Sequence, residues 1–261
     1  MAAPGRVEFK NVAKDFRLRG GATYTAIADL SFSVEPGEVV VIVGQTGAGK
    51  STALSLLLGL SAPSRGTVGI DGRDPHAEAA HFRGRIGIIF QTDRLMPWRT
   101  ALGNAVYGLE ILGREKGARE RAAMQWLERL GLAAFADAWP HQLSGGMRQR
   151  VSIARTFALD PDILVADEAF SHLDELTARD LRRDLLQLVR ESGKTTIFVT
   201  HSVDEAVTLG DRILVFARPG RVARTLTVPA GIDEARRTVI RAEVVAALED
   251  ARAAAPAPAS S

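Results

Sequence analysis

Cysteine is missing from the sequence, which has 261 residues. The chain can therefore form neither a disulfide nor a thiolate metal site, and this absence is compatible with a cytosolic protein without requiring one. Basic residues barely outnumber acidic ones, with a formal net charge of +2, so the overall charge does not indicate a nucleic-acid partner. Hydrophobic residues at 46% and charged residues at 25% are ordinary for a soluble globular protein.

Long apolar segments are also missing. The uncharged stretch at residues 51–64 is shorter than the roughly 20 residues that a membrane-spanning helix needs, and the opening MAAPGRVEFK lacks the apolar core of a secretory signal. We therefore expect a soluble protein, or one attached to a membrane only through a partner. Its length allows one large domain or a domain with an added lobe.

The glycine-rich stretch Gly44–Thr52 is the most informative segment that is present. Its sequence GQTGAGKST fits the pattern G-x-x-x-x-G-K-[ST]. The β-branched run Val39–Val43 before it is typical of a strand buried on both faces, and the apolar segment Ser51–Leu60 after the glycines predicts a helix. Strand, glycine loop and helix together place backbone N–H groups and a helix N-terminus around a phosphate.

The residue types in this loop match that chemistry. The glycines let the backbone approach phosphate oxygens closely, Lys50 supplies positive charge for the β- and γ-phosphates, and the Ser51 hydroxyl can ligate Mg²⁺. The alternative is a glycine-rich turn without a ligand, which would need neither the lysine nor the hydroxyl. The loop therefore predicts that the chain binds a nucleoside triphosphate.

The rest of the chain predicts an α/β fold with a parallel sheet, because buried strands alternate with helices. An antiparallel β subdomain is expected at the N-terminus, and a helical lobe is expected to be inserted at about residues 92–159. Strands are expected at 6–12, 30–34, 67–70, 85–90, 162–166, 195–200, 212–216 and 224–228, and helices at 100–112, 119–130, Ser144 through Phe157, 175–191, 203–209 and 233–252. The last residues, 253–261, are expected to be disordered.

An acidic pair ends the strand predicted at 162–166. A loop that binds Mg·ATP needs a carboxylate for the metal at the end of a neighbouring strand, and Asp167 is the candidate. Because side chains alternate along a strand, Glu168 would point elsewhere, toward a water that it can orient or deprotonate. Alternatively, Glu168 caps the strand in solvent. His201 ends another predicted strand, where it reaches the γ-phosphate or is an ordinary surface histidine.

The segment LSGGMRQR at Leu143–Arg150 resembles the LSGGQ-type signature of the ATPase subunits of ABC transporters. The other motifs then follow that family's order, over roughly residues 6–218. Gly44–Thr52 resembles the Walker A loop, Gln91 the Q-loop glutamine, Ile163–Glu168 the Walker B strand with its catalytic glutamate, Ser171–Asp174 the D-loop, His201 the switch histidine, and Phe16 the aromatic residue that stacks on adenine.

The aromatic assignment has an alternative. Phe16 and Tyr24 flank a polar loop, and either ring could stack on a base or pack at the edge of a small antiparallel sheet.

The resemblance implies a P-loop NTPase fold of the RecA-like kind, with ATP and Mg²⁺ as cofactors. It implies an ATPase domain at 1–228, with a core at 6–91 and 160–228, followed by a C-terminal helix at 229–252. The implied catalytic residues are Glu168, His201 and Gln91, the implied metal ligands are Ser51, Gln91 and Asp167, and the implied nucleotide-binding residues are Phe16, Gly44, Gln45, Thr46, Gly47, Ala48, Gly49, Lys50, Ser51, Thr52, Ser144, Gly145, Gly146 and Asp174.

A finer resemblance rests on the segment Leu95–Val106, which is similar to the LLPW…NV segment of importer ATPases of the nitrate/sulfonate/taurine type. Within it, Met96 and Trp98 either contact a partner or pack in the core of the lobe. The sequence also departs from the family pattern at three positions. Ala169 stands where proline is usual and makes that turn less rigid, His172 replaces alanine in the D-loop, and Thr46 replaces serine but keeps the hydroxyl.

The resemblance also implies partners and a mechanism. Two identical subunits would pack head to tail, with each ATP between the Walker A loop of one and the Ser144–Gly146 signature of the other. Transmembrane permease subunits would dock near Gln91–Trp98, a periplasmic or lipid-anchored solute-binding protein would act indirectly, and the chain would lie peripherally on the cytoplasmic face of the inner membrane. A soluble ABC ATPase without a transport role is the alternative, and a P-loop kinase would have no use for LSGGM.

Overall fold

The computed structural model describes residues 5–19 and 21–254. The chain divides into two compact units: a central unit, Phe82–Thr196, and a terminal unit, formed by the segments up to His81 and from Ile197 onward. The disordered tail that we predicted at 253–261 is wrong at its start, because Ala253 still belongs to a helix; residues 255–261 lie outside the described residues. Within the described ranges, no helix combines the length and apolar character needed to cross a membrane.

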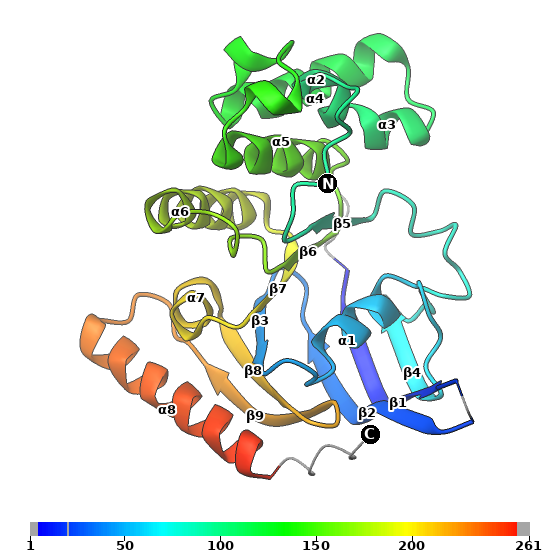
Figure 1. Ribbon diagram of the computed structural model, residues 1–261, viewed down its shortest axis with the longest axis vertical. Coiled ribbons are helices and arrows are strands. Elements are labelled where there is room, and N and C mark those ends of the chain that lie inside the picture. Colours follow the sequence, from blue (N-terminus) through cyan, green and yellow to red (C-terminus); the bar gives the residue numbers. More distant parts are fainter. Residues whose placement is uncertain (1–4, 20, 255–261) are drawn as a thin grey trace. The chain divides into compact units, whose positions relative to one another are not determined.

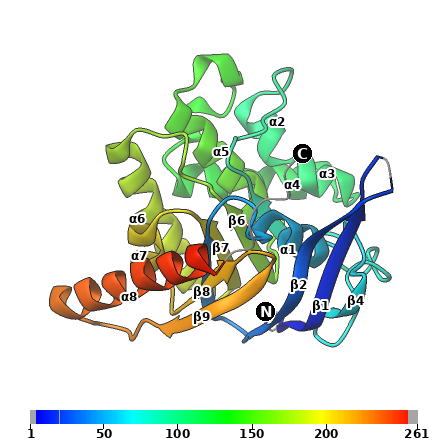
Figure 2. The same ribbon diagram turned by 60° about the horizontal axis from the view of Figure 1, so that its bottom comes forward.

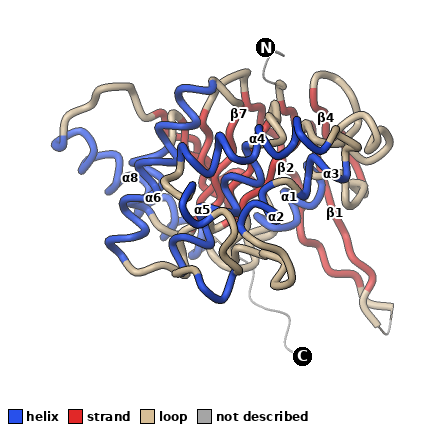
Figure 3. The backbone as a smooth tube through the Cα atoms, turned by 90° about the horizontal axis from the view of Figure 1, so that it is seen from above, coloured by secondary structure: helices blue, strands red, loops and turns tan. Residues whose placement is uncertain are grey.

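The terminal unit contains an antiparallel sheet of three strands, β1 (Val7–Arg17), β2 (Thr23–Val34) and β4 (Arg65–Ile70), in the order β2-β1-β4. Figure 3 shows β1 and β2 as long neighbouring strands. They are longer than the predicted 6–12 and 30–34 because the pairing continues as far as Arg17 opposite Thr23. Only three of the added residues, Ala13, Ala26 and Ile27, are buried, and their spacing shows no apolar alternation that would have indicated a strand.

The terminal unit also contains a mostly parallel sheet, in which β3 (Val39–Gly44) lies between β7 (Thr195–Thr200) and β8 (Arg212–Ala217). Every residue of β3 is buried, as its β-branched run predicted. The edge strand β9 (Arg221–Thr227) pairs with β8 in the antiparallel direction.

In the described part of the terminal unit, the helices are α1 (Lys50–Leu57), α7 (Val203–Leu209) and α8 (Glu234–Ala253). The helix α8 contacts β8, β9 and α7, and Figures 1 and 2 both show it running along these elements. It begins where predicted because the Asp233 side chain accepts a hydrogen bond from the Arg236 N–H and caps the helix.

The central unit pairs two parallel strands, β5 (Ile86–Ile89) and β6 (Ile163–Asp167), with a group of helices. These are α2 (Ala101–Ala105), α3 (Tyr107–Ile111), α4 (Lys116–Arg129), α5 (Gly145–Phe157) and α6 (Glu175–Ser192), with short 3-10 turns at Ala133–Phe135 and Pro140–Gln142. Figure 1 shows α2 to α5 gathered together. The α/β fold with an antiparallel sheet and a helical lobe is therefore confirmed.

Two helix predictions in the lobe need correction. The helix expected at 100–112 is divided at Val106 into α2 and α3, in a segment whose glycines at 103 and 108 weaken helix propensity. The helix expected from residue 119 begins at Lys116, because the Glu115 carboxylate accepts hydrogen bonds from the N–H groups of Gly117 and Ala118.

Candidate functional site

The glycine-rich loop lies in the terminal unit, between the end of β3 at Gly44 and the start of α1 at Lys50. Gly49 is the N-cap of α1 and has a φ of 87°, in the left-handed region that residues with a Cβ rarely adopt. Glycine offers no side chain to cap the helix, so the N–H groups of its first turn face the loop without a side-chain acceptor from the cap. Such a helix end is suited to an anion.

Lys50 is held by the loop itself. Its Nζ donates to the carbonyl oxygen of Gly44 at 2.6 Å and to that of Gln45 at 3.2 Å. The residue is only 8% exposed, and a buried ammonium requires such acceptors. The loop thus carries a fixed positive charge at the position where the sequence predicts the β- and γ-phosphates. The next residue, Ser51, is exposed at the first turn of α1.

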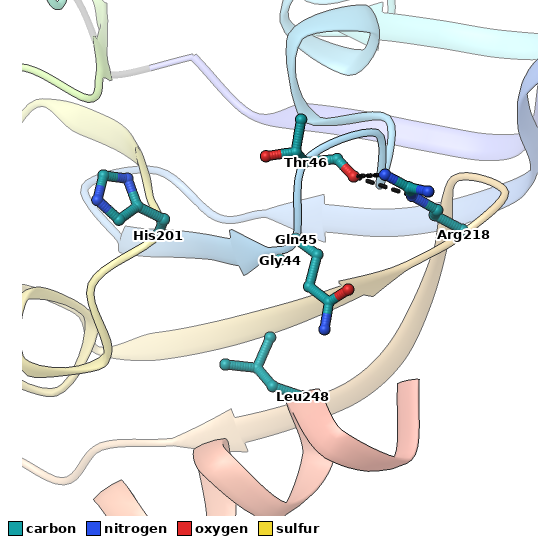
Figure 4. Close-up of a pocket in the computed structure, with 6 residues that line it drawn as sticks. All are labelled: Gly44, Gln45, Thr46, His201, Arg218 and Leu248. Atoms are coloured by element: carbon teal, nitrogen blue, oxygen red, sulfur yellow. Dashed lines mark hydrogen bonds between the residues drawn. The ribbon is translucent and has the colours of Figure 1, made fainter. Parts of the chain in front are cut away.

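A cavity of about 490 Å³ opens beside this loop (Figure 4). Four of the residues that line it were predicted as site residues from the sequence: Gly44, Gln45, Thr46 and His201. The structure therefore brings the histidine and the loop together. Two further residues, Arg218 and Leu248, also line it. The sequence did not single them out, because Arg218 comes from the β8–β9 turn and Leu248 from α8, outside every recognised motif.

Phe16 and Tyr24 lie opposite each other on β1 and β2. They are 41% and 48% exposed, so the sheet edge buries neither ring. The Lys14 ammonium lies 5.2 Å from the centre of the Phe16 ring, within the range of a cation–π contact. Both rings keep exposed area, as a stacking surface requires.

The acidic pair lies in the central unit at the end of β6. Asp167 is the last residue of the strand, but Glu168 lies beyond it with a φ of 47°. Our expectation that strand alternation would aim Glu168 was therefore wrong, because the left-handed backbone of the following turn sets its direction. Gln91 Nε2 donates to Glu168 Oε2 at 3.4 Å, so these two predicted residues are neighbours.

Gln149 of α5 connects the two segments that carry Gln91 and Glu168. Its Nε2 donates to the carbonyl oxygen of Phe90 at 3.1 Å and to that of Ala169 at 2.9 Å. The residue is 3% exposed, so this amide is a buried link between the end of β5 and the turn after β6. Gln149 belongs to the LSGGMRQR segment, but the sequence did not predict this role.

The signature segment forms the start of α5, as predicted. Ser144 is the N-cap, and its Oγ accepts a hydrogen bond from the Met147 N–H at 3.2 Å. Ser144 is exposed, and Gly145 and Gly146 form the first turn. A Cβ added to Gly146 would lie 2.6 Å from Cγ2 of Thr177 on α6, so close packing of the two helices favours glycine there.

Asp174, predicted to bind nucleotide, is the N-cap of α6. Its carboxylate accepts a hydrogen bond from the Thr177 N–H at 3.0 Å, and this bond lowers the pKa of Asp174 below its ordinary value. His172, two residues earlier, is exposed and lines a second cavity of about 280 Å³ within the central unit. The other lining residues of that cavity are Gln91, Thr92, Asp93, Gly145, Arg148, Gln149, Ala169 and Leu173.

Trp98 is 70% exposed, so the alternative that it packs in the lobe core is wrong. Met96 is partly exposed. The exposed indole stands on a segment that is anchored by the fully buried Asn104. An exposed tryptophan on an anchored segment is suited to contact a partner.

The donors present fit Mg·ATP. Among the described residues no cluster of three or more His, Cys, Asp or Glu could hold a metal by itself. Mg²⁺ is usually bound through one or two protein oxygens together with substrate phosphates and waters. The Ser51 hydroxyl and the Asp167 carboxylate, which the sequence predicts as ligands, are oxygens of this kind.

The strand, the glycine loop with its buried lysine and the helix that follows define a P-loop nucleotide-binding protein. The comparisons identify the family. Residues 27–171 match the family model described as ABC transporter. The taurine import ATP-binding protein TauB of Rhizobium johnstonii is 40% identical over 208 residues, covering 79% of this chain and 78% of that protein. The chain belongs to the ABC transporter family, as its ATP-binding ATPase component, with ATP and Mg²⁺ as cofactors.

Two further similarities agree with this assignment. The glycine betaine/carnitine transport ATP-binding protein GbuA of Listeria monocytogenes is 45% identical over 216 residues, but this chain spans only 54% of its length. A solved ATP-binding cassette, a dimer in a post-hydrolysis state with ADP and Pi, has a TM-score of 0.75 and 33% identity, covering 86% of this chain and 99% of that one.

Proposed function

We propose that the chain is the ATP-hydrolysing subunit of a membrane importer for a small solute, and that it works through ATP-driven head-to-tail dimerisation. The observation that carries this proposal is the exposed N-terminus of α5, with Ser144 as its cap and two glycines in its first turn. It is a second helix end suited to phosphate, besides the one beside Lys50. Each nucleotide would lie between the Lys50 loop of one copy and the Ser144 end of the other.

The residue roles follow from the chemistry of each side chain. Gly44–Thr52 would bind the phosphates, Ser51, Gln91 and Asp167 would ligate Mg²⁺, Phe16 would stack on adenine, and His201 would contact the γ-phosphate. Bound Mg·ATP supplies the phosphoryl group that is transferred to water. Glu168 orients or deprotonates that water, and its contact with Gln91 makes it sensitive to movement of the segment that Gln91 begins. Asp174 positions the D-loop by capping α6.

We propose the domain boundaries and the partners from the same family resemblance. The ATPase domain spans 1–228, with its lobe at about 92–159. Permease subunits dock near Gln91–Trp98, and the exposed indole of Trp98 supports this site. The chain would lie peripherally on the cytoplasmic face of the inner membrane, and a solute-binding protein would act through the permease.

The solute class is proposed from one segment. Leu95–Val106 resembles importers of the nitrate/sulfonate/taurine type, and the taurine-import relative at 40% identity supports that class. The betaine/carnitine relative has a similar identity of 45%, so overall identity does not favour one solute. ATPase stimulation by taurine, by nitrate and by betaine, in the complex with permease and solute-binding protein, distinguishes the classes.

Trapping the dimer tests the proposed mechanism. Glu168→Gln keeps the size of the side chain but removes the base, so the variant should bind ATP, hydrolyse it at least about a hundredfold more slowly, and sediment as a dimer only with ATP. Ser144→Arg in that background places a bulky charge at the α5 N-terminus and should abolish the dimer while nucleotide binding persists. Normal turnover by Glu168→Gln, or an unchanged dimer after Ser144→Arg, would contradict the proposal.

A further inference from the structure

Arg218 contacts the glycine-rich loop from the β8–β9 turn. Its Nε donates to the carbonyl oxygen of Thr46 at 2.9 Å, and its Nη2 donates to the same oxygen. Figure 4 shows the guanidinium directed at that carbonyl, with the Thr46 hydroxyl pointing to the opposite side. Two donors of one charged group thus converge on a single backbone oxygen of the loop, and charge-assisted hydrogen bonds are stronger than neutral ones.

The base of the Arg218 side chain is fixed. The Ala28 N–H of β2 donates to the carbonyl oxygens of Pro219 and Gly220 at 3.2 and 3.3 Å. Gly220 is buried, and a Cβ there would lie 2.5 Å from the carbonyl oxygen of Ala26. The turn that carries Arg218 is therefore tied to β2, so the guanidinium acts from a rigid support.

Because the peptide bond is planar, the contact between Arg218 and the Thr46 carbonyl also sets the direction of the Gly47 N–H. The C=O of Thr46 and the N–H of Gly47 belong to one planar trans peptide unit, in which they point in opposite directions. A carbonyl oxygen that is held on the Arg218 side therefore directs the Gly47 N–H away from Arg218. Gly47 has a φ of 79°, in a region where glycine is permissive and its peptide units reorient readily.

We propose that Arg218 is a positioning residue for nucleotide binding: it fixes the orientation of the Thr46–Gly47 peptide so that the Gly47 N–H is presented to the phosphates. The inference rests on the proposed role of Gly44–Thr52 as the phosphate loop. Arg218 would act on the affinity of the loop for phosphate rather than on the transfer step, because its described hydrogen bonds are to the backbone of the loop.

The test compares three variants for binding of a non-hydrolysable ATP analogue with Mg²⁺ and for steady-state ATPase activity. Arg218→Ala should weaken analogue binding and raise KM for ATP by about tenfold, with kcat at saturating ATP changed less than about threefold. Arg218→Lys retains a charged donor and should recover most of the affinity. Arg221→Ala removes the same charge from the same hairpin, at an exposed position, and should bind nucleotide like the wild type.

Thermal unfolding separates positioning from folding. Arg218 is exposed, so the apo form of Arg218→Ala should unfold close to the wild-type temperature, whereas the stabilisation by added analogue should be smaller. Wild-type affinity in Arg218→Ala, or an equal loss in Arg221→Ala, overturns the inference. Lys50→Ala distinguishes failure of the proposed phosphate loop from failure of the positioning role of Arg218. If Lys50→Ala still binds the analogue, the proposal that Gly44–Thr52 is the phosphate loop is wrong. If Lys50→Ala loses the analogue while Arg218→Ala keeps it, only the positioning role is wrong.

Discussion

Asn104 and Met96 exchange two hydrogen bonds: the Met96 N–H donates to Asn104 Oδ1 at 2.7 Å, and Asn104 Nδ2 donates to the Met96 carbonyl oxygen at 3.1 Å. The same Nδ2 donates to the carbonyl oxygens of Arg99 and Thr100 at 3.1 and 3.0 Å. One fully buried amide thus holds the backbone on both sides of Trp98.

Asn104→Ala is expected to lower the free energy of unfolding by about 1–3 kcal/mol, because partly buried backbone groups of the 96–100 segment lose their hydrogen-bond partner. Urea denaturation of the purified chain measures this change. A loss below about 0.5 kcal/mol would show that water or a local shift replaces the amide.

Trp98→Ala, by contrast, is expected to leave stability unchanged and to weaken binding of a partner. The indole is exposed, so its removal should change the free energy of unfolding by less than about 0.5 kcal/mol. It should nevertheless reduce co-purification of the chain with its permease, because a large aromatic anchor is lost from the proposed docking surface. Undiminished co-purification would place the docking site elsewhere.

Gln149→Ala should lower kcat by about tenfold or more while ATP affinity stays near that of the wild type. The variant releases the carbonyls of Phe90 and Ala169, whose neighbours Gln91 and Glu168 are proposed to act in hydrolysis, and it leaves the Lys50 loop unchanged. Steady-state ATPase assays and analogue binding measure the two effects. Gln187→Ala, at an exposed position of α6, is the matched control and should keep wild-type kcat.

Acid should remove one stabilising contribution at α4. The hydrogen bonds from Gly117 and Ala118 hold the pKa of Glu115 below its usual value of 4.5. A carboxylate whose pKa is lower in the folded protein stabilises the fold above its unfolded-state pKa, and this contribution is lost as the pH falls through the folded-state pKa.

Glu115→Gln should therefore be less stable than the wild type near pH 7, and the difference should shrink as the pH falls below about 4.5. Urea denaturation across this range measures it. Glu120→Gln, on the same helix, removes an equal charge without removing the cap. A difference between wild type and Glu115→Gln that stays constant with pH would show that the lowered pKa does not contribute to stability.

The elements whose determinants are local could be predicted from the sequence. The run Val39–Val43 specified β3, and Ser144 before two glycines specified the start of α5. The limits of α7, Val203–Leu209, agree with the prediction. In each case the apolar period or the capping residue lies inside the segment that it defines.

The contacts that were not predicted link distant residues to backbone carbonyls. Arg218 and Thr46 are 172 residues apart, and Gln149 lies 59 residues from Phe90. Every residue has a backbone carbonyl, so the sequence does not indicate which carbonyl will accept a hydrogen bond. The left-handed backbone at Glu168 was missed for a related reason, since only the fold specifies the turn that requires it.

That turn also restricts how the protein can evolve. Proline at position 169, usual in the family, would push residue 168 toward extended backbone with φ near −120°, whereas Glu168 here has a φ of 47°. Replacing Ala169 by proline alone would therefore conflict with the present path of the chain at the glutamate. We therefore expect positions 168 and 169 to be coupled, since proline at 169 would require another backbone path at the glutamate.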